Sequence, residues 1–209
     1  MRTALIVLLC VGTLVVAGQN NNIDSLKTVL AHQSNQKSRV KPLLDLCWEY
    51  RFINADSARK YGLKALAISQ ELDLPDYEVE ALHNLGVTHE AQGNYLEALD
   101  FEQKALTLRK VLGDESKTAN TLNNIGIIYD EQGDFKKAIA YYLDARKIYE
   151  KLNDDGKIAM VIINMAIVFK SQKEYPRVIA SYQEALKIYE RLNNKFGIAA
   201  CHANLGSVY

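Results

Sequence analysis

Apolar residues recur at helical spacing along most of the chain. Between residues 78 and 92, Leu82 and Leu85 fall on the same side of a helix with 3.6 residues per turn. A polar break follows, in which Gly93 can adopt the left-handed conformation that ends a helix. A second periodic stretch then runs over about residues 95–112. The pattern predicts a hairpin of two helices.

The same pattern returns every forty residues. The motif Asn-Leu-Gly at 84–86 recurs as Asn-Ile-Gly at 124–126, Asn-Met-Ala at 164–166 and Asn-Leu-Gly at 204–206. The break Gln-Gly-Asn-Tyr at 92–95 recurs, with substitutions, at 132–135 and 172–175. A weaker copy precedes them, with Ala58 and Ala65 at matching positions. Several positions of the motif recur at the same spacing of forty residues, without insertions or deletions. This regularity predicts an array of equal helical hairpins.

Small and aromatic residues alternate at fixed positions of the repeat. Gly86 is predicted to face the partner helix of its hairpin, because small residues let two helix axes approach to roughly 8–10 Å. Ala105 and its equivalents are expected to do the same against the following unit. Aromatic residues such as Tyr142 and Tyr182 are then expected to fill the core between the helices.

One set of positions resembles the signature of the tetratricopeptide repeat. The matching residues in one copy are Leu122, Gly126, Tyr129, Ala138, Tyr142 and Ala145. The resemblance covers residues 38–209, and the forty-residue period is similar to the long-repeat variants of kinesin light chains and bacterial signalling proteins. It implies an all-α fold, a right-handed superhelical solenoid of antiparallel helix hairpins whose first helices line a concave groove. The first copy, with Leu46 and Gly62 at signature positions, is the least typical, and in the copy that contains Lys173 a lysine replaces the turn glycine.

The chain is predicted to have three parts. Residues 1–18 have an uncharged, largely apolar run after Arg2, which is typical of a secretory signal peptide; the alternative is an uncleaved signal anchor. Residues 19–37 form a capping region, with an amphipathic helix at Ile23 to His32. Residues 38–209 form the array, with about four complete repeats and the first helix of a fifth. The unpaired last helix suggests a fragment of a longer protein; the alternative is pairing with another chain.

Composition narrows the possible functions. The chain has 25 Lys+Arg and 25 Asp+Glu residues, so no basic excess favours binding of nucleic acid. No glycine-rich phosphate loop, nucleophile elbow or zinc-type spacing of Cys and His is present in the sequence. The histidines are widely spaced, and Cys47 and Cys201 are predicted to be small buried hydrophobes. We therefore expect neither an enzyme nor a cofactor or metal site.

The recurring asparagines are the strongest candidates for a binding site. Asn84, Asn124, Asn164 and Asn204 occupy one equivalent position in the first helix of each hairpin. Asn is a mediocre helix former, but its amide both donates and accepts hydrogen bonds, which suits the backbone of an extended peptide. The resemblance implies this role, since peptide-binding tetratricopeptide proteins use Asn at the matching position. The alternative is that each Asn bonds a neighbouring helix of the array.

Further residues on the first helices are expected to face the same groove. They are His83, Asn123, Asp130 and Lys170. The predicted partner is a protein or an extended peptide, bound by an exported protein in the periplasm or another extracytoplasmic space. An alternative is the extracytoplasmic input domain of a longer signalling protein, namely a histidine kinase, a nucleotide cyclase or a transcription regulator. Contact with a membrane is expected only through an uncleaved signal or a missing C-terminal region.

Overall fold

The computed structural model describes residues 22–208, so the predicted signal peptide at residues 1–18 lies outside the described part. Residues 22–32 are helical, and helices then follow one another to the end of the described chain. Their bounds are α2 Gln36–Tyr50, α3 Ala55–Glu71, α4 Pro75–Glu90, α5 Tyr95–Leu112, α6 Glu115–Glu131, α7 Phe135–Lys151, α8 Asp155–Ser171, α9 Tyr175–Arg191 and α10 Lys195–Gly206. The predicted all-α solenoid of helix hairpins is confirmed.

Polar side chains fix where most helices begin. The Oδ1 atom of Asp114 accepts a hydrogen bond from the backbone N–H of Lys117 at 2.9 Å, which satisfies one donor left open at the start of α6. Asn or Asp residues cap other helices in the same way; they are Asn35, Asn54, Asp134, Asp154 and Asn194. Helix α4 has no side-chain cap and begins with Pro75 in its first turn. It therefore starts earlier than the predicted range of 78–92, since proline suits a position whose N–H has no helical partner.

A left-handed residue recurs every twenty residues. These residues are Asp73, Gly93, Gly113, Gly133, Asn153, Lys173 and Asn193, with φ between 50° and 77°. Each one follows a helix and reverses the chain, so the predicted left-handed role of Gly93 is confirmed. The forty-residue repeat is therefore built from two halves of equal length that end in the same kind of turn.

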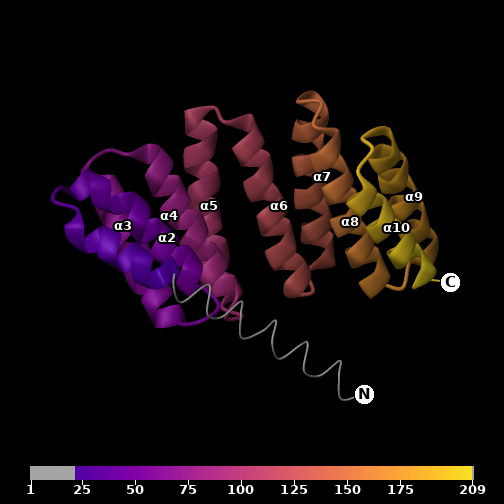
Figure 1. Ribbon diagram of the computed structural model, residues 1–209. Helices are drawn as coiled ribbons and strands as arrows, with labels where there is room; N and C mark the ends of the chain where they lie inside the picture. The colour runs from indigo at the N-terminus through magenta and orange to yellow at the C-terminus, as the bar shows by residue number, and fades with distance from the viewer. Residues whose placement is uncertain (1–21, 209) are drawn as a thin grey trace, which may run out of the picture. The chain divides into compact units, whose positions relative to one another are not determined.

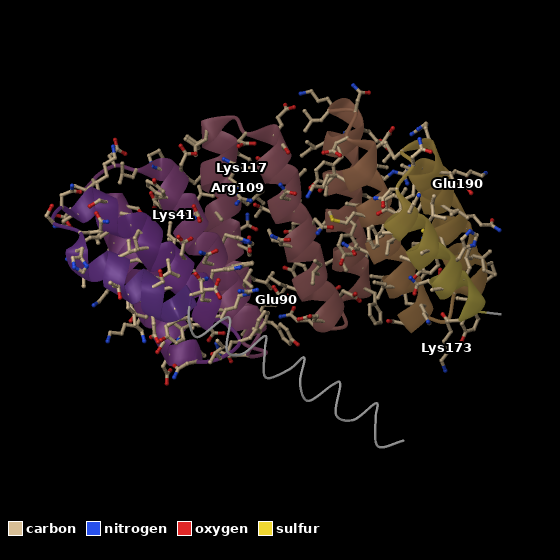
Figure 2. The ribbon with its side chains drawn as sticks, viewed as in Figure 1. Lys41, Glu90, Arg109, Lys117, Lys173 and Glu190 are labelled. Carbon is tan, nitrogen blue, oxygen red and sulfur yellow. The ribbon has the colours of Figure 1, made fainter. Side chains whose placement is uncertain are left out.

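Lys173 adopts this backbone conformation at a steric cost. Its φ is 60°, where a Cβ atom crowds the following carbonyl oxygen and costs roughly 1–2 kcal/mol, whereas glycine has no Cβ and costs little. The side chain is exposed (Figure 2), so replacing it removes no buried contact. We expect Lys173→Gly to raise the free energy of unfolding by about 0.5–1 kcal/mol, measured by urea denaturation.

The converse substitution is the matched control for Lys173→Gly. A Cβ atom at Gly133 would meet no other atom within 4 Å, so Gly133→Lys changes only the backbone preference. It should lower the free energy of unfolding by about 1 kcal/mol. Equal stabilities of all three proteins would contradict a backbone cost at these turns.

The chain divides into two compact units inside α5, one ending at Ala105 and the other starting at Leu106. In unit 1, α3 packs on both α2 and α4, and α2 also contacts α4. The centre of this core is a cluster of fully or almost fully buried residues: Val40, Leu43, Leu44, Ala65 and Ala81. Leu30, from the helical segment at residues 22–32, packs against this cluster.

In unit 2 each helix from α6 to α10 packs on the next (Figure 1). The small residues lie where helices cross. A Cβ atom at Gly126 of α6 would stand 2.6 Å from Cε1 of the Tyr142 ring, which is 1% exposed in α7. Ala145 and Ala185 are fully buried. No helix among residues 22–208 is both long and apolar enough to span a membrane.

Candidate functional site

A pocket of about 310 Å³ opens on unit 1 at the first helices of two consecutive hairpins. Helices α2 and α4 each contribute three of its residues. The lining consists of Lys41, Asp45, Trp48, Glu80, His83 and Asn84. In α2 the three residues are spaced by four and three positions, and in α4 His83 and Asn84 lie three and four positions after Glu80, so the residues of each helix share one face. The volume suits one or two side chains of a ligand and is at the small end for ligand sites.

The charged groups of the pocket are organised around Lys41. Its Nζ atom lies 2.9 Å from Oδ1 of Asp45 and 2.9 Å from Oε1 of Glu80. The two carboxylates stabilise the ammonium, which raises the pKa of Lys41 although burial opposes the shift. All three side chains remain partly exposed, so the ion pairs contribute little to stability but orient the two carboxylates.

Trp48 supplies the aromatic surface of the pocket. It is the only tryptophan of the chain, and 40% of it is exposed. The guanidinium of Arg51 lies 3.7 Å from the ring centroid, and the His83 ring is tilted against it at 6.4 Å. A large, half-exposed aromatic side chain in a concave site is typical of an anchor for a protein ligand.

His83 is held in place from behind by a buried carboxyl group. Its Nδ1 atom lies 2.7 Å from Oε1 of Glu102 in α5, and Glu102 is 0% exposed. The other carboxyl oxygen, Oε2, is buried and has no hydrogen-bond partner. The hydrogen bond to Nδ1 leaves Nε2 of the imidazole as the ring nitrogen that can serve a ligand.

Asn84 lies at the floor of the pocket and is 5% exposed. Its Nδ2 atom donates a hydrogen bond of 3.2 Å to the carbonyl oxygen of Leu44 in α2. Leu44 occupies the equivalent position of the preceding repeat, so this bond joins consecutive first helices. At Asn84 the amide donor is thus used within the array, as the alternative for these asparagines expected.

The comparisons with known proteins agree with this architecture. The model of the tetratricopeptide repeat family matches residues 54–110 and 103–151. This chain is a tetratricopeptide-repeat protein. No curated protein sequence matches it.

Solved structures with the same fold belong to proteins of several kinds. BtubC from P. vanneervenii superposes with a TM-score of 0.74 at 22% identity, over 93% of this chain and 81% of that one. A signal transduction ATPase with a tetratricopeptide repeat sensor, from Pyrococcus horikoshii, gives 0.80 at 19% identity, over 91% and 30%. A Rap protein complexed with competence and sporulation factor gives 0.73 at 17% identity, over 92% and 60%. This tetratricopeptide-repeat chain therefore spans less than two thirds of the length of each of the last two.

In unit 2 several of the predicted site residues form hydrogen bonds within the chain. Nδ2 of Asn164 in α8 donates to Oδ1 of Asn123 in α6 at 2.9 Å, and Asn123 is 4% exposed. The Nζ atom of Lys170 donates to the hydroxyl of Ser207, just after α10, at 3.1 Å. Asn204 bonds within its own helix, to the carbonyl oxygen of Ala200. Contact between these residues and a ligand stays a prediction.

Asn124 and Asp130 are both half-buried on α6. Burial raises the pKa of the Asp130 carboxyl. Near the start of α6, Arg109 donates to the carbonyl oxygen of Lys117, so these two labelled residues brace the turn between α5 and α6 (Figure 2). The Arg109 side chain is buried, and in this tetratricopeptide array it stabilises the turn.

The two cysteines of the described chain, Cys47 and Cys201, are both buried. Burial raises the pKa of the Cys47 thiol to about 11 and also raises that of Cys201, so neither forms a reactive thiolate near neutral pH. Among residues 22–208, no group of three or more His, Cys, Asp or Glu side chains could hold a metal ion.

Sequence reasoning identified His83 and Asn84 but missed the other four residues of the pocket. The first repeat is the least typical copy, so the repeat signature drew no attention to Lys41, Asp45 or Trp48. The available signal was the spacing of these three residues along one helix face, together with the single tryptophan of the chain.

Proposed function

We propose that this protein is a non-catalytic scaffold that binds an extended peptide or protein segment on the first helices of its repeats. The pocket around Trp48 carries the proposal, because a half-exposed tryptophan between two consecutive first helices offers an anchor point on an otherwise polar surface. The likeness of the fold to a Rap protein complexed with competence and sporulation factor supports it as analogy.

A displayed library of random peptides of about twelve residues tests this proposal. Peptides enriched on the immobilised protein should change the fluorescence of Trp48, which reports on the pocket alone because the chain has no other tryptophan. Trp48→Ala, whose binding is measured by isothermal titration calorimetry because the variant lacks the fluorescent reporter, should bind these peptides at least about tenfold more weakly, a typical loss for an interface anchor.

The matched control is Leu96→Ala. Leu96 is 78% exposed on α5, the second helix of a hairpin in the same unit, so the substitution removes exposed apolar surface away from the pocket. Binding should be unchanged in this variant. The proposal fails if no peptide is enriched, or if both substitutions weaken binding equally.

A second proposal is that the chain serves as the extracytoplasmic input domain of a longer signalling protein. The apolar run from Thr3 to Gly18 supports export, and the likeness to the sensor repeats of a signal transduction ATPase supports a sensory role. Fractionation of cells that express the full chain, compared with a chain lacking residues 1–18, tests export. Equal distribution of the two proteins would exclude it.

A further inference from the structure

Among the residues that line the pocket on α2 and α4, carboxylates outnumber cations, and the guanidinium of Arg51 lies over Trp48 outside this lining. Asp45 and Glu80 carry two carboxylates against one ammonium, that of Lys41. The buried carboxyl of Glu102 lies behind His83, with its Oε1 atom 2.7 Å from Nδ1 of the imidazole. Inside a concave site such an excess attracts cations more strongly than on a flat surface.

The Lys41 ammonium already shows where a cation is accommodated. It lies 2.9 Å from one oxygen of each carboxylate. The Asp45 and Glu80 side chains are 37% and 39% exposed, so their second oxygens can accept further hydrogen bonds from solvent or a ligand. A planar guanidinium has several donors in a fixed fork and can bridge two carboxylates without displacing Lys41 entirely.

Trp48 adds a second kind of attraction for the same ligand. One cation, the guanidinium of Arg51, already lies over its ring at 3.7 Å. The part of the indole that faces the pocket provides further π surface beside the carboxylates. Carboxylates beside an aromatic ring favour a cationic side chain over an acidic or purely apolar one.

We propose that the pocket recognises a basic side chain, arginine above all, of the bound peptide. This inference rests on the proposed peptide-binding function and specifies its ligand. Arginine fits better than lysine because its fork reaches both carboxylates while its plane stacks on Trp48. An acidic anchor residue would be repelled by Asp45 and Glu80.

Two displayed peptide libraries distinguish this inference from the function on which it rests. Both are random except for one central position, fixed as Arg in one and as Glu in the other. We expect the Arg library to be enriched at least about tenfold over the Glu library on the wild-type protein. In a synthetic enriched peptide, replacing the Arg by citrulline, which keeps the shape and removes the charge, should weaken binding about tenfold as measured by Trp48 fluorescence.

Variants of the pocket complete the test. Asp45→Asn with Glu80→Gln should remove the preference for Arg over citrulline, whereas Lys41→Ala should strengthen binding of the Arg peptide several-fold because a competing cation is lost. Equal enrichment of both libraries, or equal binding of Arg and citrulline peptides, would overturn the basic anchor and leave peptide binding intact. Enrichment from neither library would overturn both proposals.

Discussion

Replacing His83 by alanine is expected to lower the free energy of unfolding by about 3 kcal/mol. Glu102 is 0% exposed, and His83 is the hydrogen-bond partner of one of its carboxyl oxygens while the other has none. Without the imidazole, the whole carboxyl group would be buried and unpaired. The estimate is at the lower end for breaking a buried pair because the His83 side chain is 23% exposed.

A double-mutant cycle separates this cost from a loss of packing. Glu102→Met removes the carboxyl but keeps much of its volume, so His83→Ala in that background should cost about 1 kcal/mol or less. Urea denaturation gives the energies, and hydrogen exchange should show the loss of protection in α4 but not in α8 or α9, because repeats are coupled mainly to their neighbours. The explanation fails if His83→Ala is equally costly with and without Glu102.

The substitution Gly126→Val is expected to destabilise the protein by about 3 kcal/mol through overpacking. Even a single Cβ at this position would stand 2.6 Å from the Tyr142 ring, closer than real contacts allow. The ring is 1% exposed and enclosed by α6 and α7, so it has little room to move. The two helices must separate instead, at the expense of contacts along the hairpin.

Gly206 provides a control at the same position of the repeat, eighty residues along the chain. A Cβ at Gly206 would meet no other atom within 4 Å, so Gly206→Val should change stability by less than about 0.5 kcal/mol. Thermal unfolding followed by circular dichroism compares the two variants. A similar loss in both would mean that valine in the helix, and not the contact with Tyr142, is responsible.

The repeat fold could be predicted from sequence because one pattern recurs in register. A small residue, glycine or alanine, recurs at positions 86, 126 and 166. The recurrence supports the assignment of each helix, even where the sequence of a single helix would be ambiguous. Ala166 is fully buried, which shows that the array can accept a methyl group where the crossing is built around it. The periodicity predicts such a position but not the distance of closest approach.

The candidate site was harder to predict because it depends on what differs between repeats. The shared asparagine ladder drew attention to Asn84 and Asn164, and the bonds of both amides run within the array. Glu102 has no charged equivalent in the next repeats, where Tyr142 and Tyr182 occupy its position. A buried carboxyl and its histidine partner lie nineteen residues apart on separate helices, a pairing that no helical periodicity reveals.

The left-handed turns at twenty-residue intervals also set how such a gene can change in length. Unequal recombination that adds or removes forty codons would add or remove a whole hairpin. Every first helix would then still be followed by a second helix, and every second helix by a first. A change of twenty codons would preserve every turn, yet it would place each downstream first helix where a second helix belongs. Lineages of this array should therefore differ in length by whole hairpins, and half-hairpin variants should be removed by selection although their turns are intact.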